Sequence, residues 1–547
     1  MNSLKPMLLT SLKSYDRTQF AKDVTAGIIV AIIALPLSIA LALASGVGPE
    51  AGIFTAIVAG FVISALGGSS VQIAGPTAAF ATIVAGIVAK DGLDGLVIST
   101  ILAGIFLILM GFCHFGSLIK FIPYTITTGF TSGIAVTIVI GQLKDFFGVT
   151  YPDGVKPIET TEKFKAFIEN ISTANKDALI VGIVSLAILI ISPMIFKKIP
   201  GSLIAVIIGI LMVKFLPLKV STIGNLYTIS NSLPSFHIPS VNLEIVQNAI
   251  PNAFTIAVLA AIESLLSCVV ADGMINGKHR SDMELVAQGA GNIASALFGG
   301  IPATGAIART AANIKNGGRT PVAGMVHSIT LVIVLVVLMP FAGMIPMPTI
   351  AAILFIVAYN MCQWRTFVHL IRTAPKSDII VLFTTFILTI LFDLVVAIEI
   401  GMMLACLLFI KRMSEETHID SWVYVDDDTP DVNEHLQKLP LQIRVYEITG
   451  PLFFGAADAI ERIVVKDFTT CLVLRMRSVP AIDSTAMNAL QNLVKVCEGK
   501  GITLVFSHVN EQPMRVMKKA GFVELVGEEN FCPNISEALA HAEDLIK

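Results

Sequence analysis

A short stretch, residues 299–315 (GGIPATGAIARTAANIK), combines small residues with a single arginine. Gly299, Gly300 and Pro302 predict a helix start, because the N–H that proline lacks would be unpaired there in any case. The backbone N–H groups of such a start are open to a ligand, and the helix dipole favours an anion. Arg309, expected about two turns into this helix, adds a full charge and a bidentate donor for an oxyanion. These residues predict an anion-binding site.

Glu263 places a carboxyl group inside the apolar segment AAIESLLSCVV. An ionisable residue within a membrane span is costly and points to a function. A buried carboxyl group is suited to carrying a proton. Alternatively, its oxygens and the hydroxyl of Ser264, or of Ser267 one turn further on the same face, would hold a sodium ion. The structural alternative is an ion pair between Glu263 and Arg309.

An internal repeat with an offset of about 226 residues relates the two halves of the chain. It matches residues 74–79 (AGPTAA) with 300–305 (GIPATG), and the position equivalent to Pro123 falls close to Pro348 in the sequence. Gly75 and Pro76 are therefore expected to open a second half-helix, with Thr77 in its first turn. Two such helix starts facing each other would concentrate partial positive charge on one small volume, as in secondary transporters.

The elements that must hold these residues are membrane helices. Of the 547 residues, 54% are hydrophobic and 14% are charged, whereas soluble domains have about a quarter charged. Apolar runs recur from Val24 to about residue 410, and several are long enough to cross a bilayer. About fourteen segments are expected, some too short to span, with starts near Val24, Ala51, Pro76, Leu93, Leu118, Lys176, Pro200, Pro251, Leu285, Ala303, Pro321, Pro348, Asp378 and Leu394. Seven segments per half is an odd number, so the second half is expected to be inverted.

Positive charges indicate the orientation in the membrane. With the N-terminus inside, most Lys and Arg clusters fall on the cytoplasmic side, whereas Lys156–Lys176 lie in one longer outside loop. The inside clusters include Lys13, Arg17, Lys22, Lys197, Lys198, Lys278, Arg280, Lys315, Arg319, Arg365, Arg372, Lys376, Lys411 and Arg412. Both ends of the chain are therefore expected in the cytoplasm. The first 20 residues do not resemble a signal peptide, so Val24–Ala44 is expected to be a retained span.

The C-terminal part changes in character. Residues 1–22 are expected to be a cytoplasmic segment, 23–412 the membrane domain, 413–437 an acidic linker and 438–547 a small α/β domain. In that domain strands are expected at 441–449, 471–476, 502–508 and 523–526, with helices at 456–465, 484–498, 513–520 and 535–546. Asp483 or Ser484 is expected to cap the second of these helices.

Several function classes lack support in the sequence. The net charge of −3 argues against a nucleic-acid partner. The seven cysteines have no CxxC spacing, so neither a metal site nor a disulfide framework is expected. The chain carries no HExxH, GxSxG or P-loop motif, so it is not expected to be a metalloprotease, a hydrolase or an ATP-driven pump.

The motifs together resemble the sulfate permease family of anion transporters from about Asp23 to the C-terminus. The resemblance rests on DVTAGIIVAIIALPLSIALALASG, QIAGPTAAF, AAIESLLSCVVADGM, FGGIPATGAIARTAANI and, in the tail, IDSTAMNAL. It implies a polytopic α-helical membrane protein with fourteen segments in a seven-plus-seven inverted repeat, divided into core and gate domains. It also implies a homodimer with a C-terminal cytoplasmic STAS domain, named after sulfate transporters and anti-sigma factor antagonists.

The resemblance also assigns roles to residues. It implies that the anion is surrounded by Pro76, Thr77, Ala78, Thr304, Gly305 and Arg309. It implies that Glu263, with Ser267, couples a cation. Family members with Asp at the position of Glu263 include sodium-coupled bicarbonate carriers, whereas those with Glu look more like proton-coupled carriers of dicarboxylates such as fumarate. Ser267 stands where the sodium type carries Thr, which favours protons. Leu37 replaces the Gln that many members have after the proline of the first span.

The expected function is therefore secondary active uptake of a small anion, a dicarboxylate, sulfate or bicarbonate, by alternating access. The expected coupling ion is a proton and no other cofactor is expected, although sodium-coupled bicarbonate symport is the alternative. A nucleobase carrier and a membrane receptor that signals through the STAS domain are further alternatives. The protein is expected to be a lipid-embedded homodimer of the cytoplasmic membrane, with a possible regulatory partner for the STAS domain.

Overall fold

The computed structural model describes residues 4–547 except 118–121, 153, 156, 196–199, 228, 230–231, 240–241, 393, 422–438, 462 and 464–467. It divides into two compact units, Met1–Met402 and Met403–Lys547. Several expectations fall outside the described residues: those for Lys156, Lys197, Lys198 and Leu118, and for the acidic linker from residue 422 onward.

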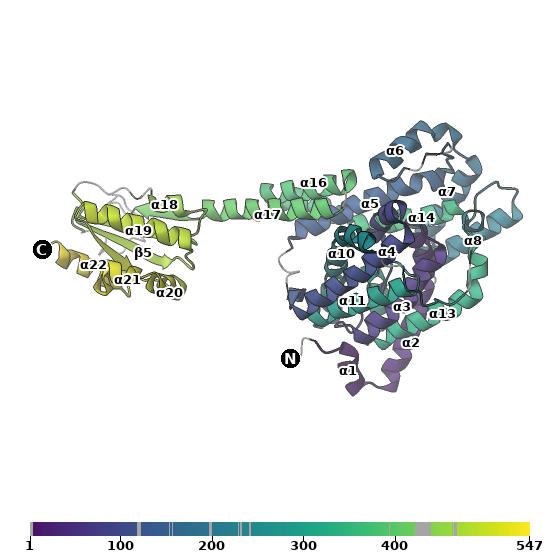
Figure 1. Cartoon of the computed structure of the whole chain (residues 1–547), viewed down its shortest axis with the longest axis horizontal. Coiled ribbons are helices and arrows are strands. Elements are labelled where there is room, and N and C mark those ends of the chain that lie inside the picture. Colours follow the sequence, from purple (N-terminus) through teal and green to yellow (C-terminus); the bar gives the residue numbers. More distant parts are fainter. Residues whose placement is uncertain are drawn as a thin grey trace. The chain divides into compact units, whose positions relative to one another are not determined.

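The first unit is built almost entirely from helices (Figure 1). They are α1 (Met7–Ser11), α2 (Arg17–Ala44), α3 (Pro49–Leu66), α4 (Ala81–Phe112), α5 (Tyr124–Phe147), α6 (Thr160–Glu169), α7 (Lys176–Ile195), α8 (Gly201–Phe215), α9 (Ile223–Leu226), α10 (Leu243–Ile275), α11 (Ser281–Leu297), α12 (Ile307–Lys315), α13 (Val322–Ala342), α14 (Met347–Cys362), α15 (Trp364–Thr373), α16 (Lys376–Leu391) and α17 (Leu394–Glu415), which continues into the second unit. Short 3₁₀ turns are η1 (Leu12–Ser14), η2 (Ala78–Phe80) and η4 (Ile171–Thr173). Among the described residues, eight helices are long and apolar enough to cross a membrane. The expected polytopic helical architecture is therefore confirmed.

The predicted helix starts agree closely with the structure in several places. Helices α7, α8, α13, α14 and α17 begin within one residue of the predicted positions. The segments predicted to start near Pro76 and Leu93 are joined in one helix, α4, which is kinked at Gly92. Gly92 has a φ of 71°, which a residue without a side chain adopts readily. The short helices α6 and α15 were not predicted as separate elements.

The helices of this unit pack in two groups. In one group α4 packs against α10 and α11, while α13 packs against α2 and α3. In the other group α5 packs against α14 and α16, while α7 packs against α8 and α14. Helix α14 also contacts α2, so the two groups meet along that pair. This division fits the core and gate domains that the resemblance implies.

Small residues bring helices of the first group close together. A Cβ atom on Gly104 of α4 would lie 2.6 Å from the carbonyl oxygen of Gly289, and one on Gly289 of α11 would lie 2.4 Å from that of Gly104. Such contacts between small residues are a common way for membrane helices to associate. The crossing fixes α11 against α4, and both helices flank the residues discussed below.

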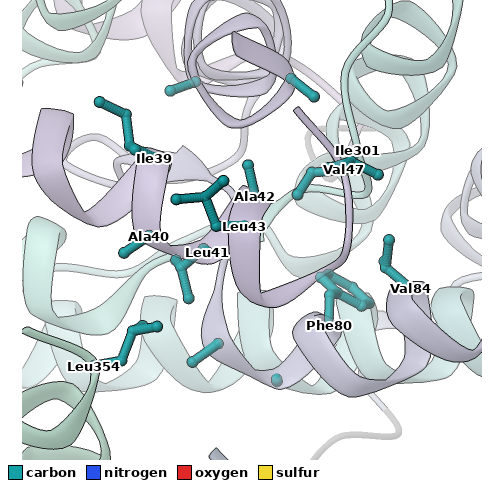
Figure 2. Close-up of a cluster of buried hydrophobic side chains, with 14 of the residues drawn as sticks. Ile39, Ala40, Leu41, Ala42, Leu43, Val47, Phe80, Val84, Ile301 and Leu354 are labelled. Atoms are coloured by element: carbon teal, nitrogen blue, oxygen red, sulfur yellow. The ribbon is translucent and has the colours of Figure 1, made fainter. Parts of the chain in front are cut away.

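The buried core extends around the start of α4 (Figure 2). Phe80 and Val84 are both fully buried and belong to the same cluster as the C-terminal part of α2. Ile301 and Leu354 of α14 join this cluster from other parts of the chain. The packing holds the beginning of α4 rigidly, which matters because the preceding residues line the candidate site.

The second unit contains a five-stranded sheet in the order β3-β4-β5-β6-β7. Its strands are β3 (His418–Ser421), β4 (Ile443–Thr449), β5 (Cys471–Ser478), β6 (Thr503–Ser507) and β7 (Phe531–Cys532). β3 pairs antiparallel with β4, and the other pairs are parallel. Its helices are α18 (Ala457–Glu461), α19 (Ser484–Gly499), α20 (Glu511–Lys519), α21 (Phe522–Val526) and α22 (Ile535–Leu545), with a 3₁₀ turn η5 (Glu528–Asn530). Separate apolar clusters form on the two faces of the sheet, one with α19 and one with α22.

Two expectations for this unit are corrected. Residues 523–526, predicted as a strand, lie in helix α21, and the last strand is β7 instead. The first residues of the predicted linker 413–437 continue α17 to Glu415 and then form the edge strand β3. The predicted N-cap is confirmed, since the Asp483 carboxylate accepts a hydrogen bond of 2.9 Å from the Ala486 N–H.

Candidate functional site

Two very short strands from opposite halves of the chain meet inside the membrane unit. β1 (Ala74–Gly75) pairs antiparallel with β2 (Thr304–Gly305), with Ala74 opposite Gly305 and Gly75 opposite Thr304. All four residues are buried. Because lipid cannot satisfy backbone hydrogen bonds, irregular backbone at membrane depth has to be enclosed in protein or line a cavity. The pairing meets that requirement and brings the two halves together where the repeat predicts it.

A helix begins shortly after each strand. Thr77 precedes η2, which leads into α4, and Ala306 precedes α12. Neither cap side chain bonds the first N–H groups of its helix, so these backbone donors remain free of side-chain caps. The positive ends of two helix dipoles therefore point toward the strand pair.

The predicted register of both half-helices is wrong by a few residues. Thr304 and Gly305 belong to β2, not to the first helical turn, and Pro302 precedes the strand. β1 begins at Ala74 and β2 at Thr304, so the two strands start 230 positions apart, compared with the repeat offset of about 226. α12 begins at Ile307, so Arg309 lies in its first turn instead of two turns in. The reason is that the strand pair occupies the residues expected to start the helix.

Arg309 lies directly against this strand pair. Its side chain is 4% exposed, and its Nη2 donates to the Pro76 carbonyl at 3.1 Å and to the Ser38 hydroxyl of α2 at 3.5 Å. Its Nη1 is buried and has no hydrogen-bond partner among the described residues. A Cβ atom on Gly75 would lie 2.4 Å from Nη1, so only glycine leaves room for the guanidinium here. An unpartnered, buried donor of this kind is what an anion would satisfy.

Glu263 contacts the other helix start. Its Oε2 accepts a hydrogen bond of 2.9 Å from the Thr77 hydroxyl, and the side chain is partly exposed. Within the described part of the chain, Arg309 has no carboxylate within ion-pair distance, so the structure does not form the alternative Glu263–Arg309 pair. The carboxyl group and the guanidinium therefore stand separately, one at each helix start.

Ser264, which follows Glu263 in α10, forms hydrogen bonds with β2. Ser264 Oγ lies 2.6 Å from Thr304 Oγ1 and accepts the Gly305 N–H at 3.1 Å. Thr304 Oγ1 in turn donates to the Ala260 carbonyl at 3.1 Å. Ser264 thus holds β2 in place through these two contacts. Ser267, one turn beyond Glu263, is buried and its hydroxyl has no partner among the described residues.

The structure therefore brings together most of the predicted site residues. Pro76 and Thr77 follow β1, Thr304 and Gly305 form β2, and Arg309 joins both through the Pro76 carbonyl. Ala78 is the first residue of η2 and is buried, without a polar contact of its side chain. In the part of the chain that the structure describes, no group of three or more His, Cys, Asp or Glu residues is arranged to bind a metal ion.

Sequence reasoning missed the fully buried carboxylate of Glu284 in α11. Its Oε2 accepts the N–H groups of Gly68 at 2.9 Å and Ser69 at 3.2 Å. Its Oε1 accepts from the amides of Gln72 at 2.7 Å and Gln288 at 2.8 Å. All four partners are donors, which suits an ionised carboxylate, because a protonated carboxyl group would turn an O–H toward a donor.

Glu284 belongs to a polar face that supports the strand pair. The Gln72 side chain lies against Gly305, where a Cβ atom would approach its Nε2 to 2.3 Å. Asn292 donates to the Ala303 carbonyl at 2.9 Å and accepts the Ala303 N–H at 2.8 Å, just before β2. The signal for this face was visible in the sequence as Glu284, Gln288 and Asn292, spaced four apart on one side of a helix.

Comparisons with known proteins agree with this architecture. A model of the sulfate permease family matches residues 20–385, and a STAS domain model matches residues 437–538. YvdB of Bacillus subtilis, which is named for sulfate transport, is 38% identical over 532 residues, covering 95% of this chain and 97% of the relative. The bicarbonate transporter BicA of Picosynechococcus sp. is 31% identical over 538 residues, covering 95% and 94%.

The fold is also that of a solved structure. SLC26A9 superposes with a TM-score of 0.87 at 19% identity, covering 99% of this chain and 93% of the other. The fold of the chain is therefore a known one, and the sequence matches extend over nearly the whole length. The chain belongs to the sulfate permease family, as a multi-pass membrane protein whose C-terminal unit is a STAS domain.

Proposed function

We propose that this protein is a secondary active transporter of a small anion that works by alternating access. The observation that carries the proposal is the buried Nη1 of Arg309, which has no partner among the described residues and lies where two helix starts meet. A guanidinium and free backbone donors together bind an oxyanion through charge-assisted hydrogen bonds. The sulfate and bicarbonate transporters among the relatives support an anion of this kind.

The proposed coupling ion is a proton carried by Glu263. This carboxyl group accepts a hydrogen bond from Thr77 at the first helix start, and Arg309, at the second, donates to the carbonyl of Pro76, the residue before Thr77. An ionised Glu263 would repel an incoming anion, and a proton removes that repulsion. Proton binding and anion binding therefore favour each other, which is the requirement for symport. The inside-negative membrane potential opposes anion entry, and the proton offsets this cost as well.

A sodium-coupled bicarbonate symporter is the second candidate. The observation that favours it is the buried hydroxyl of Ser267, which has no partner in the described part of the chain and lies one turn from Glu263. A hydroxyl and a carboxylate would both be oxygen ligands for a sodium ion. The bicarbonate transporter among the relatives supports the same reading.

One experiment separates these candidates. The purified protein is reconstituted in vesicles, and uptake of sulfate, bicarbonate and fumarate is measured with an acid-outside gradient and, separately, with a sodium gradient. Proton coupling predicts accumulation under the pH gradient without sodium. An absolute sodium requirement would assign the protein to the second candidate, and no uptake or exchange of any anion would favour a receptor.

The assembly and orientation are proposals too. The family resemblance implies a homodimer in the cytoplasmic membrane. The distribution of positive charge indicates that both termini lie in the cytoplasm. Cross-linking in native membranes would test the dimer. Protease accessibility of the STAS unit in inside-out and right-side-out vesicles would test the orientation.

A further inference from the structure

Three buried polar groups without partners follow one face of helix α3. They are Arg309 Nη1, both ring nitrogens of His327 and the hydroxyl of Ser64, and none has a hydrogen-bond partner among the described residues. His327 is fully buried, and Ser64 and Arg309 are each 4% exposed. A neutral imidazole has one donor and one acceptor, and leaving either unpaired in a protein interior is costly.

Contacts with α3 place these groups in a row. Arg309 Nη1 lies beside Gly75, where a Cβ atom would be 3.6 Å from Ala56. A Cβ atom on Gly60, the next turn, would lie 4.0 Å from His327 Nδ1. Ser64 occupies the turn after that. We call Arg309 Nη1, His327 and Ser64 the α3 polar row.

The contacts between helices α13 and α3 place the groups of the row in the same order. A Cβ atom on Gly324 would lie 2.1 Å from Ser64 Oγ, so the start of α13 faces the end of α3. One turn further along α13, His327 lies near Gly60, and Ser328 donates to the Ala56 carbonyl at 3.1 Å. The two helices thus run antiparallel, with the row between them and β1.

The spacing of the row suits water molecules. Successive turns of a helix are about 5.4 Å apart, and a water whose two hydrogen bonds of about 2.8 Å meet at a roughly tetrahedral angle joins groups about 4.5 Å apart. One or two waters would therefore link groups on neighbouring turns. Buried waters in proteins typically satisfy polar groups that have no protein partner. From Ala56 to Ser64 the row approaches the C-terminal end of α3, where the Met7 N–H donates to the Gly67 carbonyl.

We propose that the α3 polar row is a proton-transfer route, with His327 as its relay residue, between the anion site and the side of the membrane that holds the N-terminus. In one transfer, the carboxyl group of Glu263 releases its proton to a water at Arg309. That water passes a proton to one ring nitrogen of His327, and the other ring nitrogen releases its proton to a water at Ser64. The hydroxyl of Ser64 accepts a proton from this water and donates its own to water on the side that holds the N-terminus. Overall Glu263 loses one proton and that last water gains one, while His327 changes only its tautomer, which must then reset.

The positive charge of Arg309 is expected to control the passage of protons along this route. Arg309 is the charged member of the α3 polar row, and His327 follows it one turn further along α3. On the other elements packed against α13, Asp23 of α2 is held by the Thr320 hydroxyl at 2.6 Å, and Glu50 lies at the opposite end of α3. A bare guanidinium repels a proton that approaches the row, whereas a bound anion cancels that repulsion. Protons are therefore expected to pass mainly when the anion site is filled.

The inference rests on the proposed proton coupling, and its test keeps the two apart. Full-length wild type, His327→Asn and Ser64→Ala are reconstituted in vesicles containing a pH-sensitive dye. Each is assayed for anion exchange at equal pH and for uptake driven by an acid-outside gradient. The probe is whichever of sulfate, bicarbonate and fumarate the wild type transports. Ser99→Ala is the matched control, because the buried hydroxyl of Ser99 in α4 also has no partner among the residues that the structure describes but lies outside the row.

For His327→Asn we expect exchange within about twofold of wild type and gradient-driven uptake lowered by at least about tenfold, in line with the loss of a positioned proton carrier. Ser64→Ala should show a smaller loss, and Ser99→Ala none. Gradient-driven uptake at the wild-type level in His327→Asn would overturn the proposed relay but not the proposed proton coupling. If that variant does not fold, gradient-driven uptake at the wild-type level in Ser64→Ala would overturn the relay. A wild type that is indifferent to the pH gradient would overturn the coupling proposal and the relay together.

Discussion

Two glutamates on neighbouring helices show how differently one side chain is used in this membrane unit. Glu284 of α11 is fully buried and accepts four hydrogen bonds, all from N–H donors. Glu263 of α10 is partly exposed and accepts one hydrogen bond, from the Thr77 hydroxyl. A carboxylate whose lone pairs are all occupied is fixed in one state, whereas one with free oxygens is able to gain and lose a proton. The number of donors around a carboxyl group separates a structural role from a coupling role.

The largest effect is expected for Glu284→Gln. The new amide would point an NH₂ group at donors from Gly68, Ser69, Gln72 or Gln288, so at least one donor becomes unpaired. We expect a loss of about 3 kcal/mol or more in the free energy of unfolding, together with poor recovery of folded protein. Fluorescence-detected size-exclusion after heating would measure the stability. A variant as stable as wild type would show that Glu284 is not the support inferred here.

Arg309→Ala is expected to lower anion affinity by about 10- to 100-fold, because a charge-assisted bond contributes about 1.5–3 kcal/mol. The folded state should be kept, since the guanidinium is held only by Pro76 and Ser38 and pairs with no carboxylate in the described residues. Isothermal titration with the transported anion would measure the affinity, and the heating assay would check the fold. Unchanged affinity would remove Arg309 from the site.

Gly75→Ala sharpens the same point without removing a charge. The added methyl group would meet Arg309 Nη1 at 2.4 Å, so the guanidinium has to move away from the strand pair. We expect a loss of anion affinity of about tenfold. Gly86→Ala in α4 is the matched control, because a Cβ atom there meets no other atom within 4 Å. Equal affinities of the two variants would contradict the close approach.

Glu263→Gln should have the smallest effect on stability and binding. The amide imitates the protonated carboxyl group in shape and charge, and its carbonyl oxygen is able to accept the Thr77 hydrogen bond. Anion affinity and exchange are expected within about twofold of wild type, whereas accumulation driven by a pH gradient should be lost. Uptake against a gradient by this variant would exclude Glu263 as the proton carrier. A destabilisation as large as that of Glu284→Gln would remove the distinction between the two carboxyl groups.

Much of this site was predictable from the sequence because its signals are local. The Gly and Pro residues, Arg309 and the lone carboxyl group in an apolar run each stand out without knowledge of the fold. The register of the half-helices was not predictable. Whether Thr304 and Gly305 start a helix or pair as a strand depends on Ala74 and Gly75, which are far away in the sequence.

Glu284 was overlooked for a related reason. Its residue type suggests an ordinary charge at a helix start, and two of its donors are backbone N–H groups of Gly68 and Ser69 in a distant loop. In the STAS domain, residues 523–526, which include two valines and a leucine, fitted a strand as well as a helix. Gly521 and Gly527, with φ values of 66° and 94°, bound this segment on both sides and leave room for one helical turn and a half.

The pairing of β1 with β2 also has a consequence for biosynthesis. The two strands lie about 230 residues apart in the chain, and ribosomes add about 5–20 residues per second. The polar backbone of the first strand therefore waits for about 10 to 50 seconds before its partner is synthesised. During that interval it cannot face lipid without a large free-energy cost. The nascent first half must be kept in contact with the insertion machinery or with water until the second half arrives, so substrate binding is acquired late in the maturation of the chain.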